Sequence, residues 1–280
     1  MSDPADGKIP SRNAFAARCE AVLKGLRFYS RLPVPVFAFE ADAHGMPDFA
    51  RTAWAIPVAG AIIGLVGAGI GLAAWFIGIA IPLAATLTIA ALVIATGAFH
   101  EDGLADCCDG FWGGATRERR LEIMKDSRLG TFGTAGLALA LLLRILALSE
   151  LFRLTGPMAL LLVIGIAAFS RPAALLPVLF LPPASGTGLA ADTPMPGAGA
   201  LLLALLVGGG FLVAPALYLE FSTGLFAAFG AVGVALYLAT RLSEAKIGGF
   251  TGDVLGACQQ ITEITLLIGL STAANWQGPI

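Results

Sequence analysis

The 280-residue chain is 57% hydrophobic and 13% charged, whereas charged residues make up about a quarter of an ordinary soluble domain. This contrast excludes a soluble globular enzyme. The formal net charge is −2 and there is no strongly basic segment, so nothing indicates a nucleic-acid partner. The four cysteines lack CxxC spacing, and we expect them to be free thiols.

The N-terminal segment is polar and basic, unlike the rest of the chain. Residues 1–12 are predicted to be disordered, and residues 13–280 to form a single integral membrane domain. Within it, residues 13–50 are predicted to lie at the membrane interface, because apolar and basic residues recur at helical spacing between Asn13 and Ser30. The alternative is a solvated basic helix packed on the protein.

The decisive pattern is a run of 48 residues, from Thr52 to Phe99, that holds no Asp, Glu, Lys, Arg or His. A helix needs about 20 apolar residues to cross the hydrocarbon layer, so this run predicts two crossings joined near Ile81 and Pro82. Further apolar stretches predict an all-α, polytopic membrane helical bundle over residues 54–272 with about seven spans. These are residues 54–80, 83–99, 132–152, 157–180, 200–219, 224–240 and 254–272.

The positions of the basic residues predict the orientation of the bundle. Lys and Arg concentrate before the first span, between Arg117 and Arg128, and just after the sixth span, whereas the alternate links carry few charges. The positive-inside bias places the basic segments in the cytoplasm. With seven spans they all fall on one side, together with the Pro- and Gly-rich loop at residues 181–199. We therefore expect a cytoplasmic N-terminus and an external C-terminus.

The segment after the second span carries three regularly spaced carboxylates. It reads HEDGLADCCDG over residues 100–110, so Asp102, Asp106 and Asp109 stand at i, i+4 and i+7. In a helix they lie within about 60° of each other around the axis, and like charges on one face need a cation among them. Mg²⁺ is usually held by a few carboxylates together with substrate phosphates. We therefore expect metal ligands here; the alternative is a solvated acidic face at the membrane boundary.

A second charged segment lies downstream. Residues 117–130 begin with mixed charges that suit a surface helix. They continue with Lys125, Asp126 and Arg128 beside a glycine-rich re-entry. We expect the two cations to bind phosphate, because an Arg guanidinium can bond two oxygens at once.

Two more candidates lie far off in the sequence. Asp253, in the glycine-rich segment 248–257, is expected to be a ligand, although a helix N-cap is the alternative. Arg171 is costly in lipid and is expected to face a cavity; snorkelling to the membrane edge is its alternative. There is no GxxxxGK[ST], HExxH or convincing Ser/His/Asp arrangement, so a carboxylate-bound metal is the expected catalyst.

At these residues the chain resembles the adenosylcobinamide-GDP ribazoletransferases, also called cobalamin synthases or cobalamin-5′-phosphate synthases. Two departures are Cys107-Cys108, where small or hydroxyl residues are usual, and the bulkier Phe111-Trp112. They leave the role of the thiols open. The blocks that carry the resemblance run in family order through nearly the whole chain: RFYSRLPVP at 27–35, HEDGLADCCDG at 100–110, ERRLEIMKDSRLG at 118–130 and TGDVLGA at 251–257.

The resemblance implies an enzyme of the bacterial inner membrane whose active site faces the cytoplasm. It would join α-ribazole, or its 5′-phosphate, to adenosylcobinamide-GDP with release of GMP, with Mg²⁺ as cofactor, in the last steps of cobalamin nucleotide-loop assembly. Phosphoryl transfer mostly needs positioning and charge neutralisation, which agrees with the acidic run. The resemblance assigns catalytic and metal-binding roles to Asp102, Asp106, Asp109 and Asp126, the last as a further ligand or the base, and substrate-binding roles to Lys125, Arg128, Arg171, Thr251 and Asp253.

Two other functions stay open at this point. CDP-alcohol phosphatidyltransferases carry a similar acidic motif with a different spacing and act on similar diphosphate linkages. A transporter is the other class, since broken helices in multi-span proteins often bind ions near the bilayer midplane. Here the carboxylates are expected in loops at one face, which favours an enzyme. The sequence leaves open a homo-oligomer, the number of metal ions and the lower-base specificity.

Overall fold

The structure is a bundle of helices. The computed structural model describes residues 13–186 and 193–277, and regular structure in these ranges is helical apart from one isolated bridge between Pro183 and Phe250. The predicted all-α class is confirmed, whereas the disorder predicted for residues 1–12 lies outside the described residues. The elements are α1 (Ala14–Tyr29), α2 (Phe49–Thr52), α3 (Ala55–Phe76), α4 (Ile81–Thr96), α5 (Phe99–Gly113), α6 (Arg117–Met124), α7 (Thr131–Thr155), η1 (Gly156–Met158), α8 (Ala159–Ala173), η2 (Leu176–Leu179), α10 (Ala198–Tyr218), α11 (Ser222–Ile247) and α12 (Gly252–Gln277).

The first helix begins at a capping residue. The Asn13 side chain accepts a hydrogen bond from the Phe15 backbone N–H at 3.0 Å, as an N-cap does. α1 buries Tyr29 and packs on α3, where Gly25 comes close to Ala59. Its other side leaves Phe15 71% exposed. The predicted helix is therefore confirmed, and it packs on the protein along one side only.

Small residues bring the central helices together. A Cβ atom at Gly60 of α3 would lie 2.4 Å from the carbonyl oxygen of Ala167 on α8, and one at Gly64 would lie 2.9 Å from Ile164 Cα. Lipid tails are as apolar as the side chains of a membrane protein, so close van der Waals packing of this kind is a main source of helix association. α3 and α8 form the centre on which α1, α4, α10 and α12 pack.

A sharp turn separates α4 from α5. Gly97 and Ala98 both have positive φ, of 65° and 58°, and the axes of the two helices differ by 88°. Glycine adopts this conformation readily. Arg31 also covers the turn so closely that a Cβ at Gly97 would lie 2.8 Å from its side chain. The turn therefore gives the acidic segment its own direction instead of extending the preceding span.

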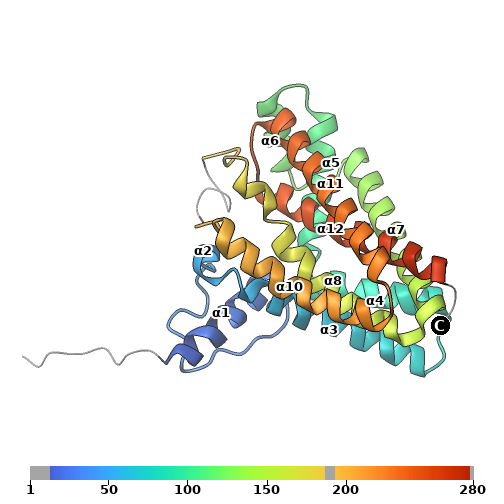
Figure 1. The fold of residues 1–280 in the computed structure, drawn as a ribbon. Coiled ribbons are helices and arrows are strands. Elements are labelled where there is room, and N and C mark those ends of the chain that lie inside the picture. Colours follow the sequence, from blue (N-terminus) through green and yellow to red (C-terminus); the bar gives the residue numbers. More distant parts are fainter. Residues whose placement is uncertain (1–12, 187–192, 278–280) are drawn as a thin grey trace, which may run out of the picture.

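The connections between the long helices lie at two ends of the bundle. Figure 1 shows the turns at residues 77–80, 156–158 and 219–221 together at the lower right, near the end of α12. α6 lies at the top, and α1 and α2 lie at the left. The links with few charges thus share one end of the bundle. This arrangement is expected if they alternate with the basic links from span to span.

The number of membrane crossings depends on two helical stretches. Five helices in the described ranges are long and apolar enough to cross a membrane, and the bent α4–α5 pair raises the number to six. One of the five is the 49-residue stretch Thr131–Leu179, which contains both α7 and α8. At about 1.5 Å per residue this stretch is longer than two hydrocarbon layers. The predicted count of seven is not confirmed.

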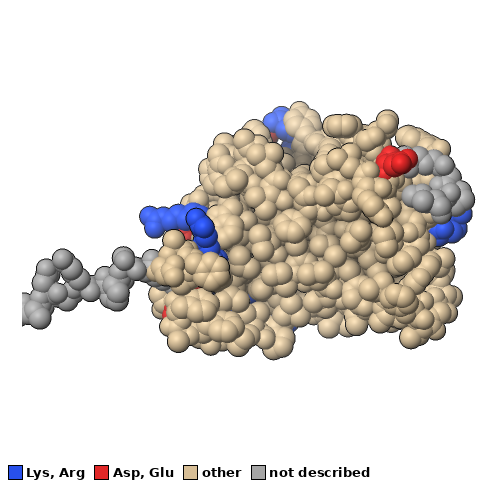
Figure 2. Space-filling model, turned by 60° about the horizontal axis from the view of Figure 1, so that its bottom comes forward, with Lys and Arg blue, Asp and Glu red and all other residues tan. Residues whose placement is uncertain are grey.

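The outer surface agrees with a membrane location. Figure 2 shows a face covered almost wholly by uncharged residues, with Lys, Arg, Asp and Glu near its margins. Large apolar side chains such as Leu206, Phe226 and Leu238 are exposed on the long helices. Extended exposed apolar surface marks contact with lipid or another protein. Together with the long apolar helices, it identifies an integral membrane protein.

Candidate active site

The acidic run forms the helix α5, so the expectation that its carboxylates lie in a loop is wrong, whereas the helical spacing of Asp102, Asp106 and Asp109 applies. The three carboxylates differ in exposure along this helix: Asp102 is exposed, Asp106 is half-buried and Asp109 is buried. α5 packs against α12, α7 and α6. The helix that carries the carboxylates therefore contacts the two helices that follow it and one that lies about 150 residues further along the chain.

The first turn of α12 lies directly against α5. A Cβ atom at Gly103 would lie 2.8 Å from the Asp253 carbonyl oxygen and 3.0 Å from Asp253 Cα, so only glycine allows this approach. The charges of Asp102, Asp253 and Asp109 all repel that of Asp106. The structure thus brings Asp253 close to the acidic run of α5, although about 150 residues separate them in the chain.

Asp109 differs from the other two carboxylates because both of its oxygens are occupied. Its Oδ2 accepts a hydrogen bond from the Gly130 N–H at 2.7 Å, and its Oδ1 accepts one from the Gly133 N–H at 2.8 Å. These donors belong to the start of α7, where a carboxylate satisfies free N–H groups and complements the helix dipole. Asp109 therefore ties α5 to α7 and holds the preceding loop beside the acidic helix.

The loop between α6 and α7 carries the predicted cations. Arg128 donates to Asp126 through Nε at 3.0 Å and through Nη2 at 2.6 Å. This ion pair lowers the pKa of Asp126 to about 2, chiefly through the side-chain hydrogen bond from Arg128. Lys125 ends α6 as its C-cap. Arg128 is thus already bound to a carboxylate, while the loop itself reaches the acidic helix through Gly130.

Two arginines of α6 hold this helix against the end of α11. Arg117 donates to the Ile247 carbonyl at 2.7 Å and to the Ala184 carbonyl at 2.6 Å. Arg120 donates to the Lys246 carbonyl at 2.9 Å. Cations bind well at a helix C-terminus because its last carbonyls have no partner within the helix. The sequence suggested only surface ion pairs here, and it missed this structural role.

Thr251 is the capping residue of α12. Its hydroxyl accepts a hydrogen bond from the Val254 N–H at 3.3 Å and donates one to Asp253 Oδ2 at 3.2 Å. Asp253 lies inside the first turn instead, where a negative charge is favoured by the helix dipole. The alternative reading of Asp253 as the cap is therefore not the arrangement found. Thr251 orients the Asp253 carboxylate.

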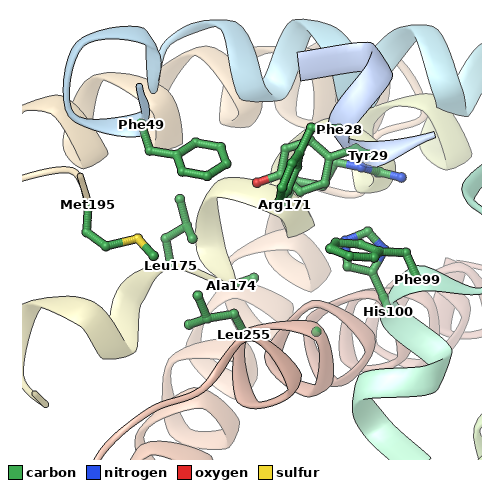
Figure 3. Close-up of a pocket in the computed structure, with 12 residues that line it drawn as sticks. Phe28, Tyr29, Phe49, Phe99, His100, Arg171, Ala174, Leu175, Met195 and Leu255 are labelled. Atoms are coloured by element: carbon green, nitrogen blue, oxygen red, sulfur yellow. The ribbon is translucent and has the colours of Figure 1, made fainter. Parts of the chain in front are cut away.

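Arg171 faces a small aromatic cavity, in agreement with the sequence analysis. Its side chain is 3% exposed, and Nη1 donates to the Ala167 carbonyl at 2.5 Å. Among the described residues its Nε has no hydrogen-bond partner. Figure 3 shows Arg171 beside Tyr29, with Phe99 and His100 to the right and Leu255 below. The cavity measures about 30 Å³, enough for about two water molecules, and Gly252 next to Asp253 lines it.

Comparison with known proteins identifies the family. The family model of cobalamin-5-phosphate synthase matches residues 21–271. The chain belongs to the cobalamin-5-phosphate synthase family. It is 49% identical over 248 residues to an adenosylcobinamide-GDP ribazoletransferase of Azorhizobium caulinodans, which covers 88% of this chain and 92% of the relative. Proteins of the same name from Xanthobacter autotrophicus and Mesorhizobium japonicum are 46% and 42% identical, over 89% of this chain and 94% and 92% of theirs. No solved structure matches.

Membership of the cobalamin-5-phosphate synthase family identifies the chain as a transferase and confirms the resemblance seen in the sequence. It does not decide which residues bind a metal. Within residues 13–186 and 193–277, no three His, Cys, Asp or Glu side chains converge closely enough to hold a metal ion by themselves. Neither Asp102 nor Asp106 has an ion-pair partner in these ranges, whereas Asp109 and Asp126 both bind protein groups.

The donor chemistry near Asp106 nevertheless fits Mg²⁺. This ion takes oxygen ligands and is usually held by one or two carboxylates, with waters and substrate phosphates completing its octahedral shell. Asp102 and Asp106 supply two carboxylates whose mutual repulsion a cation would relieve. A site of this kind needs no third converging side chain before the substrate binds.

Sequence reasoning missed a buried ionic network behind this face. Arg144 of α7 is 1% exposed and contacts Glu101 of α5 and Glu263 of α12, each at 2.7 Å. The available signal was that Arg144 and Glu263 both lie inside apolar spans. Ionisable residues at such positions pair with one another. A single sequence does not show which residue pairs with which.

Proposed function

We propose that this member of the family joins α-ribazole, or its 5′-phosphate, to adenosylcobinamide-GDP and releases GMP. The ribose 3′-hydroxyl oxygen forms a bond to the phosphorus that bears the cobinamide, the bond from that phosphorus to the bridging oxygen breaks, and the oxygen leaves with GMP. The hydroxyl proton passes to a base. The observation that carries the proposal is the contact of the acidic helix α5 with the first turn of α12, in a chain of this family.

The carboxylates divide into two groups in this proposal. Asp102 and Asp106 hold Mg²⁺, and Asp253 faces them from α12. Mg²⁺ held there would supply positive charge to offset the negative charge of the diphosphate. Asp109 supports the site by fixing α7, since both of its oxygens accept backbone hydrogen bonds. Asp126 suits a ligand or an ion-pair partner better than a base, because its pKa of about 2 is far from neutral pH.

The cations supply the binding sites for phosphate. Lys125 and Arg128 lie on the loop that Asp109 holds beside α5. A substrate phosphate competes with Asp126 for Arg128, since both bind the guanidinium fork through two oxygens. Arg171 and Thr251 complete the proposed substrate-binding set: Arg171 lines the cavity that Gly252 also lines, and Thr251 donates to the Asp253 carboxylate.

The experiment that tests this function is a reconstitution with purified protein. Adenosylcobinamide-GDP, α-ribazole 5′-phosphate and Mg²⁺ are incubated with the protein in detergent, and GMP and the corrinoid product are measured. We expect equal amounts of the two products, and no GMP when α-ribazole 5′-phosphate is omitted. Absence of GMP, together with CMP release from CDP-diacylglycerol and an alcohol, would favour the phospholipid-headgroup reaction instead.

We further propose that the site faces the cytoplasm of a bacterial inner membrane. α11 has 26 residues, or about 39 Å at 1.5 Å per residue, which is long enough for its two ends to lie on opposite sides of the hydrocarbon layer. Its last turn binds α6 through Arg117 and Arg120. The α6 end carries the basic residues, and the positive-inside bias places such residues in the cytoplasm.

Cysteine labelling tests this orientation. Glu122→Cys on α6 and Ser222→Cys at the start of α11 place exposed thiols at the two ends. The background carries Cys19→Ser and Cys108→Ser, because these native thiols are partly accessible. We expect an impermeant maleimide to label Ser222→Cys from outside and Glu122→Cys only after the membrane is opened. The reverse result would invert the orientation. Gly114 is unsuitable as a labelling site, because a Cβ there would lie 2.8 Å from the Arg120 backbone nitrogen.

A further inference from the structure

Four charged side chains are buried together behind the acidic face of α5. Arg144 Nη1 donates to Glu101 at 2.7 Å, and Arg144 Nη2 donates to Glu263 at 2.7 Å. Arg171 contributes a second positive charge that acts on both glutamates. The four residues come from α7, α5, α12 and α8, and none is more than 6% exposed. Two cations and two anions thus balance in the interior of the bundle.

Neutral side chains complete this network. Gln260 accepts from Arg144 at 3.2 Å and donates to Glu101 at 3.2 Å, and its amide also donates to Gln259 at 2.9 Å. Gln259 in turn donates to Glu263 at 2.8 Å and to Ser170 at 2.9 Å. A buried charge is tolerated when it is paired and hydrogen-bonded, and a network of this kind has few equivalent arrangements. It therefore fixes how the four helices meet.

The two nitrogens of Arg144 act on the two helices that form the candidate site. One nitrogen binds Glu101, the residue before Asp102 on α5, and the other binds Glu263 on α12. These are the helices that touch where Gly103 meets Asp253. A sliding of α5 along α12 would break one of the two ion pairs. The guanidinium therefore links α5 to α12 behind the carboxylates, and it touches neither Asp106 nor Asp253.

We propose that Arg144 is a positioning residue for the metal-binding face, acting through Glu101 on α5 and Glu263 on α12. The proposal rests on the proposed function for the identity of the site. Groups hydrogen-bonded directly to metal ligands typically change metal affinity about 10–100-fold when they are altered, and Arg144 acts one step further away, so we expect an effect at the lower end of this range. Changing Arg144 is therefore expected to lower the affinity for the metal ion more than the affinity for the substrate.

Arg144→Lys separates positioning from general stability. Lysine keeps the positive charge, so the network stays balanced, but its single ammonium lacks the two-nitrogen fork that spans Glu101 and Glu263. Arg153→Lys is the matched control. Arg153 lies on the same helix and donates to Glu150 at 2.7 Å, but this pair is exposed and does not contact the network. Glu263→Asp is a second variant that keeps the charge and shortens the reach from α12.

The readout is the binding of Mn²⁺ to the purified protein, followed by electron paramagnetic resonance, alongside steady-state GMP release. We expect Arg144→Lys and Glu263→Asp to weaken Mn²⁺ binding about tenfold or more and to lower kcat by at least about tenfold, with KM for adenosylcobinamide-GDP changed less than about threefold. Arg153→Lys should match the wild type in all three measurements.

Several results would overturn the positioning role. Wild-type Mn²⁺ affinity in both folded variants would do so, as would a wild-type protein that does not bind Mn²⁺. Failure of both variants to fold while Arg153→Lys folds would show that the network supports the fold alone. If the proposed reaction itself is wrong, the wild type releases no GMP, yet the Mn²⁺ titration still reports whether Arg144 acts on the metal-binding face.

Discussion

Gly103 of α5 lies against the backbone of Asp253, in the first turn of α12, with room for a hydrogen atom but not for a methyl group. This contact joins the two helices at the level of the carboxylates. It also explains why a glycine interrupts a run of acidic residues in the middle of a helix, where it costs roughly 1 kcal/mol relative to alanine. The close approach of α5 to α12 compensates for that cost.

The contact predicts that Gly103→Ala damages the site. The new Cβ would meet backbone atoms of Asp253 at 2.8 and 3.0 Å, so α5 and α12 must move apart. Such overpacking costs about 1–3 kcal/mol of the free energy of unfolding, and a displacement near 1 Å can cost about 100-fold in rate. We expect GMP release to fall between about 10-fold and 100-fold. The matched control is Gly209→Ala on α10, where a Cβ meets nothing within 4 Å; equal losses in both variants would count against this explanation.

Asp106→Asn is expected to abolish most of the activity without unfolding the protein. Asparagine is nearly isosteric, and it removes a charge that is repelled by three neighbouring carboxylates, so the fold does not lose a stabilising ion pair. Losing a principal electrostatic group at a reacting centre typically lowers turnover at least about 100-fold. GMP release and thermal unfolding in detergent measure the two effects. Glu122→Gln, on the exposed surface of α6, should behave as the wild type; near wild-type turnover of Asp106→Asn would contradict the metal assignment.

Asp109→Asn is expected to lower the free energy of unfolding, in contrast to Asp106→Asn, which is expected to lower activity. Both Asp109 oxygens accept backbone N–H groups at the start of α7, and the amide of asparagine would place a donor against one of these donors. Leaving a buried donor unsatisfied costs about 1–3 kcal/mol. Unfolding in denaturant, compared with Asp106→Asn, checks the prediction. A loss of Mn²⁺ binding at unchanged stability would instead show that Asp109 is a direct metal ligand.

The sequence predicted those parts of the site that depend on local spacing. The acidic run had to lie on one side of a helix, because Asp102 and Asp106 are four residues apart and the segment forms α5. The position of Asp253 at a helix start followed from the glycines before it. The resemblance then related these segments to each other, and the structure brings them into contact.

The other features of the site depend on contacts between helices across the bundle, and the spacing of residues along the chain does not show these contacts. The sequence shows that Asp109 is acidic, but not that its two oxygens accept hydrogen bonds from Gly130 and Gly133. It shows Arg144 in an apolar span, but not Glu101 and Glu263 on either side of it. The count of seven spans is not confirmed for a related reason. Hydropathy shows neither the 88° turn after α4 nor whether Thr131–Leu179, which contains α7 and α8, crosses the membrane once or twice.

The pKa of Asp126 gives a prediction for the dependence of activity on pH. The hydrogen bond from Arg128 lowers this pKa to about 2, so the carboxylate stays charged at every pH above about 4. The stabilisation from the ion pair is present above the unfolded pKa near 4 and is lost as the pH falls toward 2. Asp126 therefore does not titrate between pH 5 and 8. In Asp126→Asn, the way kcat/KM falls toward low pH in this range should match that of the wild type. The value of kcat/KM should fall by less than the roughly 100-fold expected when a general base is removed. Ser127→Ala in the same loop is the control, and disappearance of the acidic limb in Asp126→Asn alone would make Asp126 the base after all.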